Sequence, residues 1–386
     1  MKTGWETKTL NQISTNLDNR RVPITKSVRV GGEYPYYGAS GIVDYVSDYI
    51  FDEDTLLISE DGANLIARST PIAFPATGKY WVNNHAHIVK FESPVTQRFV
   101  EMYFESIPLD EYITGAAQPK LNQSALNSIP IPVPPLPEQQ RIVGILDEAF
   151  DGIATAKANA EKNLQNARAL FESHLQDIFA KGGEGSIETT LGADIDLLSG
   201  FAFKSACYSN SESDIRLLRG DNIVQGALRW DDVKRWPASE TEEFERYQLR
   251  SGDVVLAMDR PWVKAGLKRA QISADDLPCL LVQRTSRLRG NKHLNNRFLV
   301  YLISSGAFTR HILGVQTGLG VPHISGQQIK DFRFFKPPID EQVRIADGLD
   351  ALSYGTQRLE SLYQQKLTAL DALKKSLLHQ AFSGAL

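Results

Sequence analysis

The sequence predicts two related α/β (α+β) domains separated by two long antiparallel α-helices that form a coiled coil, the whole being an internal repeat with pseudo-two-fold symmetry. Three observations lead to this fold. The second half of the chain repeats the first, each half contains short β-rich runs, and each half ends in a proline-free stretch with coiled-coil spacing. The length of 386 residues also suits two or three domains better than one core.

The repeat is clearest in its C-terminal part. A shift of 203 positions places residues 119–179 on residues 322–382 without a gap, including Pro119 on Pro322 and Phe179 on Phe382. Upstream the shift falls to 199 and then to 181, so the second copy carries 22 more residues before the shared segment. A duplicated unit explains this agreement, since chance matches do not keep one register for so long.

Residues 1–135 and 184–337 are expected to be the two globular domains. Both contain short apolar runs, such as Thr55 to Ile58 and Asp253 to Leu256, with Gly, Pro, Asn and Asp between them. This pattern is typical of short strands and loops. Around residues 97–106 and 296–305 the spacing of apolar residues changes from that of a strand toward that of a helix.

The segments 136–183 and 338–386 are expected to be long helices. Each follows a proline-dense stretch and then continues for about 40 residues without proline. Apolar residues recur there at steps of three and four, which predicts a coiled-coil seam made of Ile142, Leu146, Ala149, Ile153, Leu164, Leu170 and Ile178 with Leu349, Leu352, Leu359, Tyr363, Leu370, Leu373 and Leu377. Its weak points are expected at Ala160, Asn163, Thr356 and Lys366. The run Gly182 to Gly185 should end the first helix as a hinge.

Composition limits the classes of function. The net charge of −4 gives no general prediction of nucleic-acid binding, so any such argument must be local. The chain lacks a run of 18 apolar residues and a signal peptide at Met1 to Leu10, which predicts a soluble, cytoplasmic protein without membrane partners. Cys207 and Cys279 have no partner at disulfide or zinc-ligand spacing, and both are expected to be buried apolar groups.

A specific motif stands where each long helix begins. The sequence from Pro134 to Val143 reads Pro-Pro-Leu-Pro-Glu-Gln-Gln-Arg-Ile-Val, and that from Pro337 to Ala346 reads Pro-Pro-Ile-Asp-Glu-Gln-Val-Arg-Ile-Ala. With this motif and the order domain, helix, domain, helix, essentially the whole chain resembles the specificity subunit of type I restriction-modification systems. The run from Gly252 to Leu256, echoed at Asp54 to Ile58, fits the same family.

The resemblance implies a set of expectations. Residues 1–135 and 184–337 would be target-recognition domains that bind a bipartite site on double-stranded DNA, and segments 136–183 and 338–386 would be the spacers. The spacers would also dock methyltransferase subunits, two by expectation, which endonuclease/translocase subunits join for DNA methylation and phage defence. A helix of about 42 residues is about 63 Å long, the length of roughly 18 base pairs.

Base reading requires paired donors and acceptors on loops that reach the major groove: Arg or Lys for guanine, and Asn or Gln for adenine. Matching loops occur at Gly115 to Lys120 and Gln316 to His323. The candidates for DNA contact are Tyr37, Ser40, Asn64, Asn83, Asn84, His85, Gln118 and Lys120 in the first half and Arg219, Asn222, Asp259, Arg260, Trp262, Lys264, Gln283, Arg284, Gln316 and His323 in the second. His85 and His87 lack a third ligand nearby, so no metal site is expected.

Local charge differs between the domains. Residues 260–310 hold ten Lys and Arg against two acids, which favours phosphate binding. Residues 44–61 hold seven acids and no base, and they are expected to form a surface or a methyltransferase-facing edge. A basic groove in the first domain would need scattered residues, namely Arg20, Arg21, Lys26, Arg29, Lys79 and Lys120.

Motifs for catalysis are absent from the sequence. The Pro-Pro pairs precede Leu136 and Ile339 instead of the aromatic residue of an amino-methyltransferase, and neither a phosphate loop nor a His-Glu-x-x-His motif occurs. The segment from Gly318 to His323 does not complete a dinucleotide-binding fingerprint, and Asp275-Asp276 lacks nuclease partners. We therefore expect a non-catalytic subunit without a cofactor.

Three alternatives remain open from the sequence. The chain could be a methyltransferase or nuclease with degenerate motifs, or a coiled-coil scaffold whose globular ends bind proteins. It could also serve a related system in which modification and cleavage share one polypeptide.

Overall fold

The computed structural model describes residues 4–115, 117–180, 183–318 and 320–386. It divides into two compact units: unit 1 contains residues 1–162 and 363–386, and unit 2 contains residues 163–362. The helices α5 (Leu136–Ala180) and α10 (Ile339–Ser383), 45 residues each, contribute a part to both units. Each unit is therefore a globular domain with one part of each long helix.

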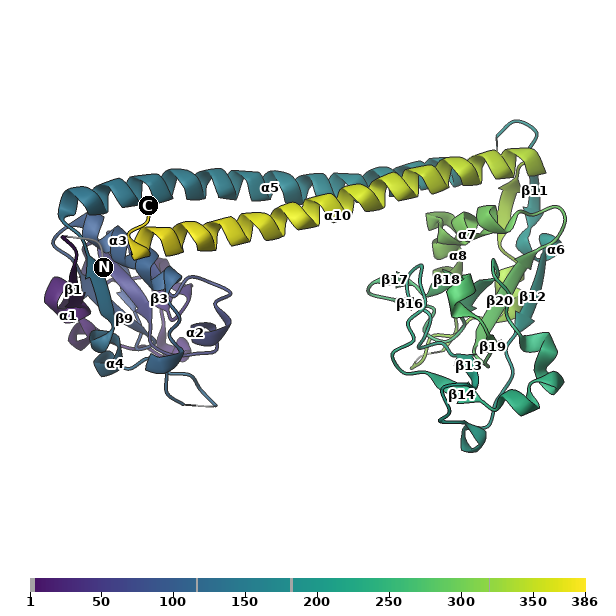
Figure 1. Cartoon of the computed structure of the whole chain (residues 1–386), viewed down its shortest axis with the longest axis horizontal. Coiled ribbons are helices and arrows are strands. Elements are labelled where there is room, and N and C mark those ends of the chain that lie inside the picture. Colours follow the sequence, from purple (N-terminus) through teal and green to yellow (C-terminus); the bar gives the residue numbers. More distant parts are fainter. Residues whose placement is uncertain (1–3, 116, 181–182, 319) are drawn as a thin grey trace. The chain divides into compact units, whose positions relative to one another are not determined.

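Unit 1 is built on a four-stranded sheet in the order β2-β9-β6-β7, with a second sheet in the order β4-β3-β8-β5 (Figure 1). Its elements are β1 (Glu6–Thr9), α1 (Leu10–Ile13), β2 (Thr15–Asn16), β3 (Gly31–Gly38), β4 (Gly41–Val46), β5 (Phe51–Asp52), β6 (Thr55–Ser59), α2 (Asn64–Ala67), β7 (Ala73–Ala76), β8 (Lys79–Val82), β9 (Ala86–Lys90), α3 (Pro94–Ser106), α4 (Gln123–Ser128) and β10 (Pro130–Val133).

Unit 2 repeats this plan. The order β12-β20-β15-β18 matches the first sheet of unit 1, and the antiparallel pair β11·β21 matches β1·β10. Its elements are β11 (Ile187–Thr190), α6 (Leu191–Asp194), β12 (Ile195–Ser199), β13 (Ile215–Leu218), β14 (Lys234–Trp236), β15 (Val254–Ala257), β16 (Trp262–Val263), β17 (Gly266–Leu267), β18 (Arg269–Gln271), β19 (Cys279–Leu281), β20 (Thr285–Gly290), α7 (Asn296–Ser304), α8 (Gly306–Val315), α9 (Gly326–Lys330) and β21 (Arg333–Lys336).

One fully buried strand separates two cores in each unit. In β6, Leu56 and Ile58 belong to the core shared with α3, whereas Leu57 belongs to the core beneath the second sheet. In β15, Val254 and Leu256 face one core while Val255 and Ala257 face the other. Side chains alternate across a strand, so a continuous apolar run is what a strand between two cores requires.

Each globular domain is attached to the long helices by the same aromatic contact. In unit 1, Phe99 of α3 lies 5.1 Å from Phe382 of α10, measured between ring centroids, and Figure 1 shows the end of α10 beside α3. In unit 2, Phe298 of α7 lies 5.2 Å from Phe179 of α5. The internal repeat predicts both pairs, because Phe179 aligns with Phe382.

A charged contact repeats in the same way. Arg98 donates to Asp147 at the start of α5, with Nε–Oδ1 at 3.0 Å. Arg297 donates to Asp350 near the start of α10, with Nε–Oδ2 at 2.8 Å, and the hydroxyl of Tyr301 donates to the same carboxylate. These Arg–Asp pairs fix the orientation of each domain on its helix.

The motif at the start of each helix has a structural explanation. The Gln139 side chain is buried, and its Nε2 donates to the Pro134 carbonyl at 2.8 Å. Gln342 is fully buried, and its Nε2 donates to the carbonyls of Pro337 (2.9 Å) and His293 (3.0 Å). It also accepts from the Asn295 amide. Backbone amides of the helix donate to the carbonyls of Pro135 and Pro338, and the glutamine side chains donate to those of Pro134 and Pro337, the first proline of each pair.

The coiled-coil prediction is confirmed in each unit. Lys157 of α5 pairs with Asp371 of α10 at 2.6 Å in unit 1, and Arg168 pairs with Glu360 at 3.1 Å in unit 2. From the first pair to the second, the residue number rises along α5 (157 to 168) and falls along α10 (371 to 360). The two helices therefore run antiparallel.

Part of the predicted seam is wrong. Leu170, Leu359 and Leu373 are exposed by 61%, 43% and 47%, whereas Ala160 and Thr356, expected as weak points, are buried. The seam in α10 keeps a strict repeat of seven through Leu349, Thr356, Tyr363, Leu370 and Leu377, and the exposed leucines lie on a neighbouring stripe. Small buried residues allow close helix approach, which a count of leucines alone does not reveal.

The two cysteines differ. Cys279 of β19 is buried as expected, and burial raises the pKa of its thiol to about 12. Cys207 is exposed, so its expected burial is wrong. It lies in a loop and a short 3-10 helix (Ser205–Cys207) that the apolar pattern does not resolve. The predicted hinge falls partly outside the described residues, because these resume at residue 183.

The two buried glutamines give a stability prediction. Gln342→Met should lower the free energy of unfolding by about 2 kcal/mol, because it leaves the Asn295 amide and the His293 carbonyl without partners. Gln139→Met should cost less, about 1 kcal/mol or under, because the buried Oε1 of Gln139 has no hydrogen-bond partner to lose. Urea unfolding combined with hydrogen exchange measures both, and equal losses would contradict the explanation.

Candidate nucleic-acid interface

Four loops of unit 1 meet beyond the end of β6. The Asn83 amide donates to the Tyr37 carbonyl at 3.0 Å, the Glu60 amide to the His85 carbonyl at 2.9 Å, and the Gly62 amide to the Pro119 carbonyl at 3.0 Å. The Ser59 hydroxyl donates to the Ala39 carbonyl. We call these four loops loop cluster 1: residues 37–41, 60–62, 83–85, and the loop whose described residues are 114–115 and 117–120.

The equivalent end of β15 gathers a second set of loops. The Met258 amide donates to the Arg284 carbonyl at 2.8 Å, and the Arg260 amide donates to the Pro322 carbonyl at 2.7 Å. The Gln283 amide donates to the Phe201 carbonyl at 2.7 Å. Loop cluster 2 consists of residues 200–201, 258–268, 283–285, 316–318 and 320–323.

One hairpin has the same form in both clusters. Thr114 and Lys120 exchange two backbone hydrogen bonds of 2.9 and 2.8 Å, and Thr317 and His323 exchange two of 2.8 and 2.7 Å. The second residue is a glycine with positive φ in each case, +85° at Gly115 and +98° at Gly318. The described parts of the two loops that the sequence placed at matching positions therefore agree in these hydrogen bonds and in the glycine conformation, and Ala116 and Leu319 lie outside the described residues.

An aspartate anchors each hairpin. Asp61 forms a β-bridge to Lys120, and its carboxylate lies 2.8 Å from Nδ1 of His85. Asp259 forms the same bridge to His323, and its carboxylate binds Nδ1 of His323 at 2.5 Å and Nη1 of Arg284 at 2.7 Å. Asp61 was not among the sequence candidates. Its alignment with Asp259, directly after matching strands, was the signal that could have found it.

The structure brings together most candidates of the first half. Ser40, Asn84, Gln118 and Lys120 are exposed in loop cluster 1, and Tyr37 and His85 are half-buried there. Asn83 is buried, and its Oδ1 accepts from the His85 amide. The side chain of Asn64 lies outside the cluster and is bonded to Ser69 and Thr70. The amides of Asn83 and Asn64 thus hold loops in place.

The second half divides similarly. Arg260, Trp262, Lys264, Gln283 and Arg284 are exposed in loop cluster 2, and Asp259, Gln316 and His323 are half-buried in it. Asn222 is buried and braces a separate turn, accepting from the Arg219 amide and donating to the Arg229 carbonyl. Arg219 pairs with Asp232 at 2.9 Å in that same region.

Acids neutralise most of the scattered cations of unit 1. Four of the six candidates form ion pairs: Arg20 with Glu53, Arg21 and Lys120 with Glu60, and Arg29 with Asp44. Burial works to raise the pKa of Glu60, but hydrogen bonds from Arg21 and Lys120 and the nearby charge of His87 hold that pKa below its usual value. The acidic run 44–61 therefore balances these cations, and Glu60 and Asp61 lie in loop cluster 1 itself.

The basic region of unit 2 is only partly neutralised. Arg284, Arg287, Arg289 and Arg297 pair with acids of other segments. Within the described residues, Arg260, Lys264 and Lys268 form no ion pair, and all three belong to the connection between β15 and β18 in loop cluster 2. Half of the six cations of residues 260–310 that form no ion pair in the described part of the chain thus lie in this one connection.

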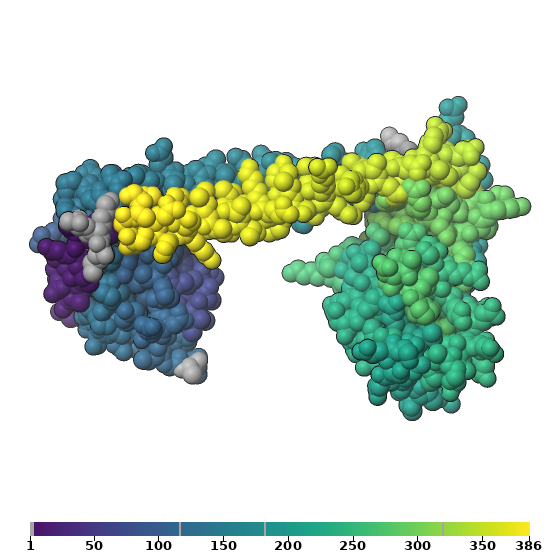
Figure 2. Space-filling view, in the orientation of Figure 1, coloured from purple at the N-terminus to yellow at the C-terminus, as the bar shows by residue number. Residues whose placement is uncertain are grey.

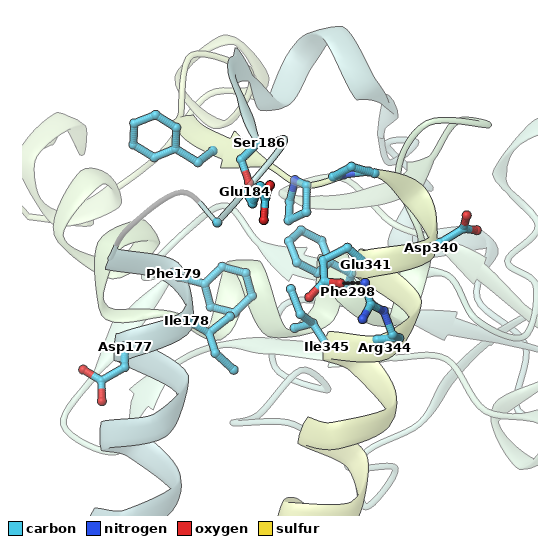
Figure 3. Close-up of a pocket in the computed structure, with 14 residues that line it drawn as sticks. Asp177, Ile178, Phe179, Glu184, Ser186, Phe298, Asp340, Glu341, Arg344 and Ile345 are labelled. Carbon is cyan, nitrogen blue, oxygen red and sulfur yellow. Dashed lines mark ion pairs between the residues drawn. The ribbon is translucent and has the colours of Figure 1, made fainter.

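A pocket near the end of α5 in unit 2 is chemically different (Figure 3). Its walls include Phe179, Phe298 and Ile345, and its charged groups are four acids and Arg344, which pairs with Glu341. An acidic rim disfavours anionic ligands such as nucleotides. Among the described residues, no group of three His, Cys, Asp or Glu side chains is placed to hold a metal ion.

No single helix in the described part of the chain is long and apolar enough to cross a membrane. The pair α7 and α8 meets that criterion only when joined across its 64° bend.

Comparison with known proteins identifies relatives. A family model for the type I restriction modification DNA specificity domain matches residues 2–165 and 208–369. The EcoAI specificity subunit of Escherichia coli is 37% identical over 188 residues, which are 47% of this chain and 31% of that protein. The MjaVIII specificity subunit of Methanocaldococcus jannaschii is 22% identical over 98% of this chain and 92% of its own length. The match to the EcoAI subunit thus spans about a third of that relative.

A solved structure shares the fold. Its title concerns complex assembly and conformational transition of the type I R-M system. The match covers 100% of this chain and 99% of the solved chain, with a TM-score of 0.74 at 15% sequence identity.

The hairpin glycine of loop cluster 2 can be tested directly. In Gly318→Ala the new Cβ would lie 2.4 Å from the Val321 carbonyl oxygen at a positive φ, so the Thr317 and His323 amides should lose protection from hydrogen exchange. Gly320→Ala is the control, because nothing lies within 4 Å of its Cβ position. Equal protection in both variants would show that the hairpin does not depend on Gly318.

Proposed function

The chain belongs to the type I restriction modification DNA specificity family, and from this premise we propose that it is the sequence-specificity subunit of a type I restriction-modification complex. The observation that carries the proposal is the duplication of one arrangement: two domains, each attached to the long helices by the same Arg–Asp pair, and each presenting the same anchored hairpin. Two similar reading heads suit a bipartite site on duplex DNA.

The two loop clusters supply the chemistry for base reading. Arg and Lys recognise guanine, whereas Asn and Gln recognise adenine, through paired hydrogen bonds in the major groove. The candidates whose side chains remain accessible are Ser40, Asn84, His85, Gln118, Lys120, Arg260, Trp262, Lys264, Gln283, Arg284, Gln316 and His323. Asn64, Asn83 and Asn222 act in loop structure instead, because their amides are already bonded within the chain.

In this proposal residues 1–135 and 184–337 are the recognition domains, and segments 136–183 and 338–386 are the spacers. A helix of 45 residues is about 68 Å long, equivalent to roughly 20 base pairs. The coiled coil would set the separation of the two half-sites, with untouched bases between them.

Partner subunits would supply all catalysis. The long helices leave apolar side chains exposed, among them Ile145, Leu170, Tyr354, Leu359 and Leu373. Exposed apolar groups along a helix pair support protein docking, here of methyltransferase subunits, two in number by the internal repeat. Endonuclease/translocase subunits would join through that assembly, in the cytoplasm.

Domain exchange tests the proposal. Replacing residues 1–135 with the corresponding domain of another specificity subunit should change one half of the methylated sequence and leave the other half unchanged, because each loop cluster reads its own half-site. Sequencing of methylated bases in a host that expresses the complex measures the outcome. The matched control replaces residues 184–337. A change in both halves after either exchange would refute independent reading, and methylation without sequence preference would favour the protein-binding scaffold.

The spacer role can be tested by adding one heptad to both helices. Insertion of seven residues after Ala160 and seven after Leu367 keeps the seam, because Lys157–Asp371 and Arg168–Glu360 then retain their register. The helices lengthen by about 10 Å, so the untouched spacer of the recognised sequence should grow by about three base pairs. Seven residues inserted in one helix only is the control, and it should reduce assembly. An unchanged spacer with full activity would contradict the proposal.

A further inference from the structure

The same connection differs between the two units. In unit 1, β6 continues to the antiparallel strand β7 through residues 60–72, and in unit 2, β15 continues to β18 through residues 258–268. The first connection contains the helical turn α2, whereas the second contains the β16–β17 hairpin. The shared scaffold thus carries two different structures in the connection that begins within each loop cluster.

The connection in unit 1 is bonded to its own domain. Arg68 adopts a positive φ of 47° at the end of α2, and its guanidinium donates to the carbonyls of Phe104 (3.1 Å) and Ile107 (2.6 Å). Asn64 closes the same loop through Thr70. Its arginine therefore serves the fold and is not available to a ligand.

The hairpin in unit 2 has a fixed base and an exposed tip. Leu267 is buried in the core, Pro261 is buried, and the Lys268 amide donates to the Pro261 carbonyl at 2.7 Å. The turn Lys264-Ala265 is exposed, and on the first strand Trp262, which pairs with Leu267, and Val263 are exposed by 39% and 37%. Figure 1 shows the hairpin standing out from the sheet of unit 2, and in Figure 2 atoms project from the surface of the unit at that place. Trp262 is thus an accessible aromatic side chain on a ribbon whose base is held by the domain.

Positive charge surrounds this tip. Arg260, Lys264 and Lys268 lie within nine residues that contain no acid, and none of the three forms an ion pair within the described residues. Burial lowers the pKa of Lys268, and the nearby charges of Arg260 and Arg229 lower it further, against the opposing effect of Asp221. Mutual repulsion of these cations is relieved by a polyanion.

We propose that the β16–β17 hairpin enters the major groove of the DNA bound by unit 2, with Trp262 against base edges and Arg260 and Lys264 on the flanking phosphates. This rests on the proposed function. The groove is about 12 Å wide and admits a two-stranded β-ribbon. At the equivalent connection unit 1 has the α2 turn, whose Arg68 is bonded to its own domain, so this connection supplies no matching cation. The salt-dependent part of binding is then carried mainly by unit 2.

The phosphate contacts are tested by the salt dependence of binding. The full chain, copurified with methyltransferase subunits, is titrated with a duplex that carries its methylated sequence at several salt concentrations. Each lost phosphate contact lowers the slope of log K against log salt by about 0.9, so Arg260→Gln with Lys264→Gln should lower it by about 1.8. The charge-matched control is Arg246→Gln with Arg250→Gln, whose exposed side chains form no ion pair within the described residues and lie outside both loop cluster 2 and residues 260–310. This control should leave the slope unchanged.

The role of Trp262 is tested by sequence readout. Trp262→Ala should weaken binding at least about tenfold and make one half of the methylated sequence degenerate while the other half stays fixed. Trp262→Phe, which keeps an aromatic ring, should retain the sequence and most of the affinity. An unchanged thermal unfolding curve confirms that the fold is intact, as expected for a side chain outside the hydrophobic cores.

The outcomes separate the inference from its premise. Suppose that the wild-type complex binds its own sequence. Equal salt slopes for the two double variants, or an unaltered methylated sequence for Trp262→Ala, would then overturn the hairpin's role and leave the proposed function standing. Wild-type complex that binds all duplexes equally would overturn both.

Discussion

The start of each long helix is held by a buried glutamine that bonds to the prolines before it, and the structure depends on this junction. Gln342 bonds to the carbonyls of Pro337 and His293 and to the Asn295 amide, so it joins α10, the preceding loop and the start of α7. About two turns later, Asp350 binds Arg297 and Tyr301 of α7. The domain therefore meets its helix at a defined angle, which the proposed base reading requires if the loops are to meet successive bases in register.

The same scaffold tolerates different loops because its strands are anchored from both sides. β6 and β15 are each buried between two cores, so their ends stay in place whatever follows them. Asp61 and Asp259, directly after these strands, hold the matched hairpins. The next residues are free to form a helical turn in one unit and a β-hairpin in the other. This separates the residues that maintain the fold from those available for recognition.

The sequence predicted an element correctly where its pattern has a single structural explanation. Proline followed by a long proline-free stretch marks a helix start, and the coiled coil was confirmed. The prediction was wrong for Leu170, Leu359 and Leu373, because the apolar stripes on a helix lie close together and only packing selects between them. It was also wrong for Cys207, which an irregular loop exposes. Among the site candidates, Asn83 and Asn222 are typical of base readers by residue type, yet both are buried and bonded within the chain.

The sequence by itself determined the duplication, the α/β character of the two domains, the antiparallel helix pair and the family, since each of these follows from periodicity or motif along the chain. Only the tertiary structure decided which side chains are accessible. It brought Asp61, His85 and Lys120 together from separate loops. Among the residues that the structure describes, it left Arg260 and Lys264 without an ion pair, while acids from other segments neutralise Arg284 and Arg287. Burial and ion pairing depend on contacts between residues far apart in sequence, and local patterns carry no record of those contacts.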